Sequence, residues 1–143
     1  MIAIGSDHNG FEMKKQQKKW FEANGIKWTD EGNTALDKDD DYPVYAKKVT
    51  DLITSGECKE GILVCGTGIG MSMAANKVKG IRAAVCGDCF SAQATKEHNN
   101  ANVLCLGARV VGPGLALKIV DTFLETEFSN QERHIRRIDM LEQ

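Results

Sequence analysis

Long apolar runs and an excess of charge of one sign are both missing from this sequence. No stretch approaches the roughly 20 apolar residues that cross a bilayer. The 18 Lys and Arg nearly balance the 20 Asp and Glu, and a formal net charge of −2 gives no broad field to attract nucleic acid or an anionic membrane. The N-terminus also lacks the basic segment and the longer apolar run of a signal peptide. We therefore expect a soluble, cytoplasmic protein that binds neither nucleic acid nor membranes.

Several signatures of known chemistries are absent as well. The sequence has no metal-ligand spacing, no Ser–His–Asp signature and no Walker lysine. The aspartates of residues 37–41 match the start of a calcium loop, but Tyr42 and Lys48 replace its required glycine and glutamate. We expect no metal and no other cofactor.

The five cysteines, an odd number, do not suggest a disulfide framework. Cys86 and Cys89 form a C-x-x-C pair, but a zinc site would need a second pair or a paired histidine. A redox pair remains an open alternative. The competing interpretation is that Cys86 ends a strand and Cys89 opens the next helix.

The length of 143 residues indicates one domain, 1–143, with no internal repeats. The patterns predict strands over residues 1–6, 26–29, 62–65, 81–86 and 103–106. They predict helices over residues 11–24, 43–55, 71–77, 90–97 and 115–124. Strands that alternate with helices predict an α/β fold, with a five-stranded parallel sheet covered by helices on both faces. We expect the lysines from Lys14 to Lys19 to face solvent and Leu115 to face the core.

The chain is organised around residues 61–77. A buried apolar strand ends at Cys65, a turn with Gly66, Gly68 and Gly70 follows, and a helix comes next. This arrangement aims backbone N–H groups and the positive end of a helix dipole at an anion. A thiol beside a helix N-terminus can act as a base or nucleophile, although a cysteine at a strand end is often only a small buried hydrophobe.

Other polar residues could join this site. Ligands bind beyond the carboxyl ends of parallel strands, which brings Asp7 and His8 close to the glycine turn. Arg133 and Arg137 share one helical face in the C-terminal segment 130–143 and could bind one phosphate, or could simply be a basic, solvated helix end. Arg109 is a further candidate anion ligand, and His98 is a candidate for proton transfer. A thiol, a backbone cradle, imidazoles and arginines suit proton abstraction beside a carbonyl on a phosphorylated small molecule.

The sequence resembles the ribose/galactose isomerase family, and within it the type B ribose-5-phosphate isomerases. The resemblance covers nearly the whole chain and rests on Gly5-Ser-Asp-His-Asn-Gly10, Asp41-Tyr-Pro43, Gly61-Ile-Leu-Val-Cys-Gly-Thr-Gly-Ile-Gly70, Ala74-Ala-Asn-Lys77, Gly80-Ile-Arg-Ala-Ala-Val-Cys86, His98-Asn-Asn-Ala-Asn-Val103, Gly107-Ala-Arg-Val-Val-Gly112 and Arg133-His134. It implies a three-layer α/β/α Rossmann-like fold and a cofactor-free aldose–ketose isomerase. Ribose 5-phosphate and ribulose 5-phosphate of the pentose phosphate pathway would be the substrates. It also implies a homodimer or a dimer of dimers with sites shared between subunits.

The resemblance also implies roles for individual residues. Cys65 would move the proton between C2 and C1, and His98 of the neighbouring subunit would open the sugar ring near Asp7. The oxyanion would be held by the Thr67 hydroxyl and by the N–H groups of Gly66, Gly68, Ile69 and Gly70. The remaining substrate contacts would come from His8, Arg109, Arg133 and Arg137 on the phosphate, from Asn99 on a sugar hydroxyl, and from Tyr42.

Two positions depart from the family pattern. Asn9 stands where the family usually has a small residue, and Met71 stands where some members carry a glutamate base. The second departure leaves Cys65 as the base. Galactose-6-phosphate or allose-6-phosphate isomerase activity remains an alternative, as does a phosphosugar-binding regulator without chemistry.

Overall fold

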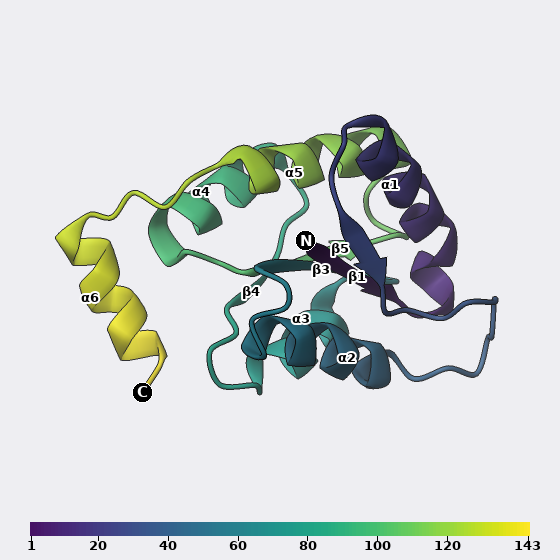
Figure 1. Ribbon diagram of the computed structural model, residues 1–143, viewed down its shortest axis with the longest axis horizontal. Helices are drawn as coiled ribbons and strands as arrows, with labels where there is room; N and C mark the ends of the chain where they lie inside the picture. Colours follow the sequence, from purple (N-terminus) through teal and green to yellow (C-terminus); the bar gives the residue numbers. More distant parts are fainter.

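The computed structural model describes residues 1–143 and contains one five-stranded sheet (Figure 1). The strand order is β2-β1-β3-β5-β4, and every pair is parallel. The strands are β1 (Ile2–Ser6), β2 (Trp28–Asp30), β3 (Glu60–Cys65), β4 (Ala83–Val85) and β5 (Val103–Gly107). The predicted five-stranded parallel sheet is therefore confirmed, with β4 shorter than expected.

Helices cover both faces of the sheet, which gives the expected three layers (Figure 1). One face carries α1 (Phe11–Ala23), α4 (Cys89–Asn99) and α5 (Pro113–Glu125), and the other carries α2 (Tyr42–Thr54) and α3 (Ile69–Asn76). A single 3₁₀ turn, η1 (His8–Gly10), precedes α1. No helix combines the length and the apolar character needed to cross a bilayer.

Alternation along the strands divides the core between these two faces. Ile4 and Ile62 point toward the layer of α1 and α5, whereas Ala3 and Leu63 point toward α2 and α3. All residues of β1 and β5 are buried, as expected for central strands of a parallel sheet. The sheet is therefore a rigid support for the loops at its carboxyl edge.

The last helix, α6 (Glu132–Leu141), stands apart from this core. It packs mainly against α4 and projects from the side of the molecule (Figure 1). Arg82 ties its end to the body, because its guanidinium pairs with Glu142 at 2.7 Å and donates to the Asn99 carbonyl at 3.0 Å. The arginines of this tail thus lie beside the end of α4.

Two expectations about side-chain environment were wrong. Lys14 does not face solvent: its side chain is 1% exposed, because the ammonium group lies 3.0 Å from the Asp30 carboxylate and donates to the Asn33 carbonyl. Leu115 is 44% exposed, and Ala116 occupies the buried position next to it. The helical spacing of apolar residues predicts which face of a helix is buried. It does not predict a polar partner from a distant segment, such as the one that buries Lys14.

Candidate active site

Three loops meet at the carboxyl edge of the sheet because β1, β3 and β5 are neighbours. The register pairs Ser6 with Val64 and Cys65 with Gly107, so the loops after these strands start side by side. The N–H of Arg109 donates to the Gly66 carbonyl at 3.0 Å, which ties the loop after β5 to the glycine turn. Asp7, His8, Cys65 and Arg109 are thereby gathered as expected.

Cys65 is the last residue of β3, and the residue is 5% exposed. The N–H of Gly68 donates to Cys65 Sγ at 3.2 Å, and the N–H of Ile69 donates to Thr67 Oγ1 at 3.2 Å. These two N–H groups of the expected cradle therefore already have partners inside the turn. The contact at Gly68 stabilises negative charge on the sulfur, and the N-terminal end of α3 adds a favourable dipole.

Tyr42 reaches the same turn from α2. A Cβ built on Gly70 would lie 2.6 Å from Cζ of Tyr42, so the aromatic ring lies flush against this glycine. The close approach explains why residue 70 has no side chain. It also brings the phenol of Tyr42 to the first turn of α3.

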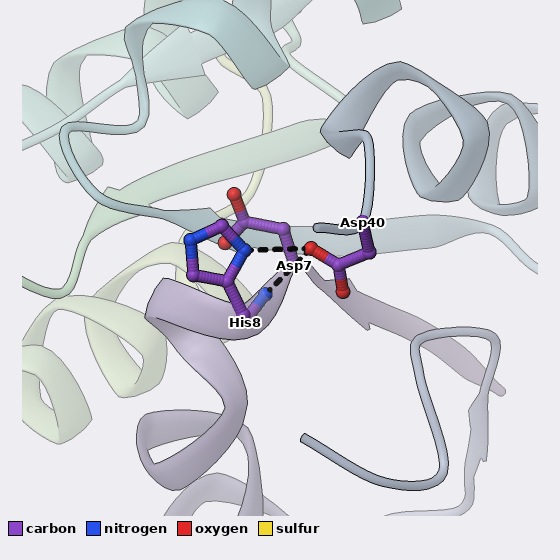
Figure 2. A group of neighbouring side chains, drawn as sticks. All are labelled: Asp7, His8 and Asp40. Atoms are coloured by element: carbon purple, nitrogen blue, oxygen red, sulfur yellow. Dashed lines mark hydrogen bonds and ion pairs between the residues drawn. The ribbon is translucent and has the colours of Figure 1, made fainter. Parts of the chain in front are cut away.

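Asp7 and His8 form the N-terminal side of the site. The Asp7 carboxylate caps η1 by accepting from the N–H of Asn9 at 2.9 Å and of Gly10 at 3.4 Å, and burial raises its pKa. His8 Nδ1 lies 2.7 Å from Asp40 Oδ1 (Figure 2), and this hydrogen bond raises the pKa of His8. The imidazole is therefore oriented by Asp40 from a distant loop and not by Asp7, the carboxylate next to it in the sequence.

Asp40 was missed by the sequence analysis. Its only signal was the run of acidic residues before Tyr42, which also resembles half a calcium loop. Ligand atoms of Asp7, His8 and Asp40 lie within 4.8 Å of one another, a spacing that could hold a metal ion. Of these three residues, His8 and Asp40 are joined by the hydrogen bond at 2.7 Å, whereas the Asp7 carboxylate accepts from the backbone of η1.

The other candidates lie at the opposite end of the sheet. The Asn102 carbonyl accepts from the N–H of Gly61 at 2.9 Å, which places the segment after α4 beside the start of β3. Cys65 is at the far end of that strand, about 16 Å away at the usual rise per residue. His98 and Asn99 are exposed there and lie far from the thiol of their own chain.

Arg133 and Arg137 belong to this second group. The rings of His98 and His134 lie 4.7 Å apart, which joins the end of α4 to α6. The pKa of His134 is lowered by burial and then by Arg133, His98 and Arg137. The two arginines are exposed and, four residues apart, share a helical face. The candidate residues of one chain thus fall into two separate groups, one with the thiol and one with the arginines.

The burial of Cys86 argues against a redox pair with Cys89. It raises the pKa of the Cys86 thiol to about 11, so this group stays protonated at neutral pH. Cys89 is the first residue of α4, as the structural interpretation predicted, whereas Cys86 lies one residue beyond β4 instead of ending it.

Comparison with known proteins agrees with the resemblance seen in the sequence. The family model described as Ribose/Galactose Isomerase matches residues 2–141. Ribose-5-phosphate isomerase B of Escherichia coli is 43% identical over 140 residues, 98% of this chain and 93% of the relative. D-erythrulose-4-phosphate isomerase of Pectobacterium atrosepticum is 43% identical over 127 residues, 89% of this chain and 84% of the relative.

A solved structure leads to the same assignment. Ribose-5-phosphate isomerase B from Mycoplasma genitalium, with bound ribulose-5-phosphate, has a TM-score of 0.94 and 43% sequence identity; the match covers 99% of this chain and 93% of that chain. Similarity of this extent, in sequence and in fold, is that of members of one family. This chain belongs to the ribose/galactose isomerase family.

Proposed function

We propose that this protein interconverts ribose 5-phosphate and ribulose 5-phosphate without a metal or other cofactor. The observation that carries the proposal is the Cys65 thiol, held 3.2 Å from the Gly68 N–H at the start of α3. A protein that only bound phosphosugars would need no such thiol. The ribulose-5-phosphate bound in the relative from Mycoplasma genitalium supports this choice of sugar.

The proposed reaction is a proton transfer through an enediolate. The Cys65 thiolate takes the proton from C2 of the open-chain aldose, which leaves negative charge on the C1 oxygen. The resulting thiol returns its proton to C1, the proton of the C2 hydroxyl passes to the C1 oxygen, and C2 becomes the new carbonyl. Charge on the oxygens would be stabilised by the Thr67 hydroxyl and by N–H groups of the glycine turn, with Gly68 reserved for the sulfur.

We further infer that two subunits complete each site. The thiol half-site of one subunit would receive His98 for ring opening, Asn99 for a sugar hydroxyl, and Arg133 with Arg137 for the phosphate, all from its partner. Because one chain holds these groups at opposite ends of the sheet, it cannot bring them onto one small sugar. His8, Arg109 and Tyr42 would complete the substrate contacts from the side of the thiol.

Exposed apolar side chains support this association. Phe90 is 80% exposed, Val110 67% and Met73 64%, and α6 leaves Met140 and Leu141 uncovered. Large apolar side chains are costly to leave in water, so an interface that covered them would be favoured. A homodimer, or a dimer of dimers, of this single domain would bury such surfaces.

Turnover of ribose 5-phosphate in the presence of EDTA tests the chemistry. We expect the wild type to be active and Cys65→Ala to lose turnover while it still binds the phosphosugar. Cys105→Ala is the matched control, because Cys105 is buried in the same core cluster. Binding without turnover by the wild type would favour the regulator, and equal rates for wild type and Cys65→Ala would rule out the thiol as the base.

Mixing two inactive variants tests the shared site. Cys65→Ala and His98→Asn subunits would each be inactive alone, but a hybrid dimer would contain one site with both wild-type groups. Random exchange should restore about a quarter of the wild-type rate, because half of the dimers are hybrids with one working site in two. No recovery after proven subunit exchange would place all groups of a site in one chain.

A different sugar phosphate is the second candidate for the substrate. The relative from Pectobacterium atrosepticum is named for a four-carbon phosphosugar, and the alternatives from the sequence carry six carbons. Values of kcat/KM for ribose 5-phosphate, erythrulose 4-phosphate, allose 6-phosphate and galactose 6-phosphate would decide among them.

We infer a cytoplasmic location, which the five free cysteines support because disulfides are rare in that reducing compartment.

A further inference from the structure

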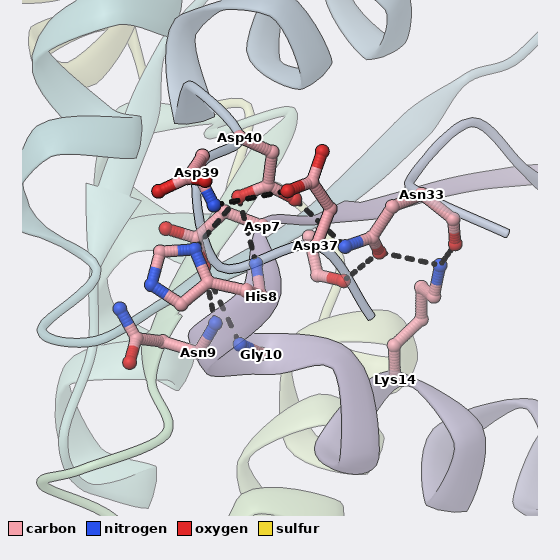
Figure 3. Close-up of polar contacts among 10 residues, drawn as sticks. Asp7, His8, Asn9, Gly10, Lys14, Asn33, Asp37, Asp39 and Asp40 are labelled. Atoms are coloured by element: carbon pink, nitrogen blue, oxygen red, sulfur yellow. Dashed lines mark hydrogen bonds and ion pairs between the residues drawn. The ribbon is translucent and has the colours of Figure 1, made fainter. Parts of the chain in front are cut away.

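Behind His8 lies a buried chain of polar contacts that the proposed reaction does not use. The side chain of Asp40 is 4% exposed, and its Oδ1 accepts from both the backbone N–H of His8 at 3.1 Å and the ring. Its Oδ2 accepts from Asn33 Nδ2 at 2.8 Å. Figure 3 shows this network running from His8 through Asp40 and Asn33 to Lys14.

Lys14 holds the far end of the network in place. Its ammonium group donates to the Asn33 carbonyl at 2.5 Å and lies 3.4 Å from Asn33 Oδ1. It also pairs with Asp30 at the end of β2, so α1, β2 and the loop before α2 are joined at one buried cation. The loop that carries Asp40 is thus fixed to the sheet rather than free to carry the carboxylate away.

We propose that Asp40 is a positioning residue for His8, and that Lys14 and Asn33 fix Asp40 for this task. A carboxylate can only accept hydrogen bonds, so the proton between the two groups belongs to Nδ1. The other nitrogen, Nε2, lies on the side of the ring away from Asp40 (Figure 2). It is therefore free to donate to an anionic group of the ligand once the ring is protonated.

The surroundings of His8 favour the charged ring. Asp7 precedes it in the chain, and Asp40 and Asp37 face it from the loop before α2, so all three carboxylates raise its pKa. Tyr45 of α2 faces Asp40, and Arg109 lies beside Gly66 across from Asn9. The inference rests on the proposed function in one respect, because it takes the ligand to be a sugar phosphate. A phosphate binds a charged imidazolium donor better than a neutral imidazole.

A pair of adjacent substitutions tests the proposal. Asp40→Asn removes the buried carboxylate, whereas Asp39→Asn removes the same charge from an exposed neighbouring residue. We expect Asp40→Asn to lower the titration midpoint of His8, followed by NMR, by about one pH unit, and Asp39→Asn to leave it nearly unchanged. Identical midpoints in both variants would overturn the proposal, whatever the substrate.

Kinetics give a second readout that a merely structural role would not move. The KM for ribose 5-phosphate should rise about tenfold in Asp40→Asn with kcat within about twofold, since a charge-assisted contact is lost. The rise should shrink toward about pH 6, where His8 is protonated in the variant as well. A loss of kcat with unchanged KM, or a rise independent of pH, would overturn the proposal.

Asn33→Ala keeps the test valid if Asp40→Asn folds poorly. It leaves the Asp40 carboxylate in the chain but removes the amide that holds Oδ2, so a smaller change of the same kind is expected in the His8 titration and in KM. Unchanged values of both would contradict the role given to Asn33 and Lys14. A wild type that does not isomerise ribose 5-phosphate would overturn the proposed function, while the titration would still test Asp40.

Discussion

Replacing Gly68 with alanine tests whether the turn around Cys65 depends on a glycine. Gly68 has φ +80°, in the left-handed region, and a Cβ at this position would lie 3.0 Å from the carbonyl carbon of Leu106. Leu106 belongs to β5, which is paired on both sides in the sheet and cannot shift easily. The substitution therefore combines backbone strain with a collision against a fixed strand.

Gly80 provides a matched control for the backbone term. It has φ +87°, and a Cβ there would meet nothing within 4 Å. Gly80→Ala should lower the free energy of unfolding by about 1 kcal/mol, the strain of a left-handed alanine. Gly68→Ala should lower it by about 2–3 kcal/mol, because the crowding against β5 adds to the same strain.

Urea unfolding of both variants at one protein concentration measures these changes in the free energy of unfolding. The comparison requires the same m-value, the slope of this free energy against urea concentration, for each variant. Gly68→Ala should also reduce kcat by about 10- to 100-fold, because the displaced N–H no longer supports the sulfur. Gly80→Ala should keep the wild-type kcat. Equal destabilisation by the two substitutions, with kcat unchanged in both, would refute the reasoning.

Two further predictions concern the buried lysine and the cysteine pair. Lys14→Met should destabilise the protein by about 2–4 kcal/mol, because it removes a buried ammonium group that pairs with Asp30 and leaves the Asn33 carbonyl without this donor. Lys15→Met, at a side chain 53% exposed, should change stability by less than about 0.5 kcal/mol. Similar unfolding curves for both would show that Lys14 is not held as described. Cys89→Ser should keep full turnover, since burial raises the pKa of its neighbour Cys86 to about 11 and the pair is no thiolate couple. A large loss of turnover would restore a functional role for this pair.

The sequence by itself was enough for the architecture and for bringing the candidate residues around Cys65 together. Apolar runs separated by helical patterns predicted the parallel sheet, because a strand that is buried on both faces is a continuous apolar run without alternating polar residues. The position of Cys65 before three alternating glycines was equally local information. Ligand sites at the carboxyl ends of neighbouring strands then follow from the topology, which is why Asp7, His8 and Arg109 were expected beside it.

Only the tertiary structure decided which groups interact across long separations in the chain. In the sequence, Lys14 looks like a surface residue, because it belongs to a helix with several lysines. Its burial depends on Asp30 and Asn33, which contact it from another segment of the chain. Asp40 is one acid among several in the sequence, and the fold alone selects it as the partner of His8. The separation of His98 from Cys65 also follows from the topology. Helix α4 ends just before β5 begins, so His98 lies at the amino-terminal ends of the parallel strands, whereas Cys65 lies at the carboxyl end of β3.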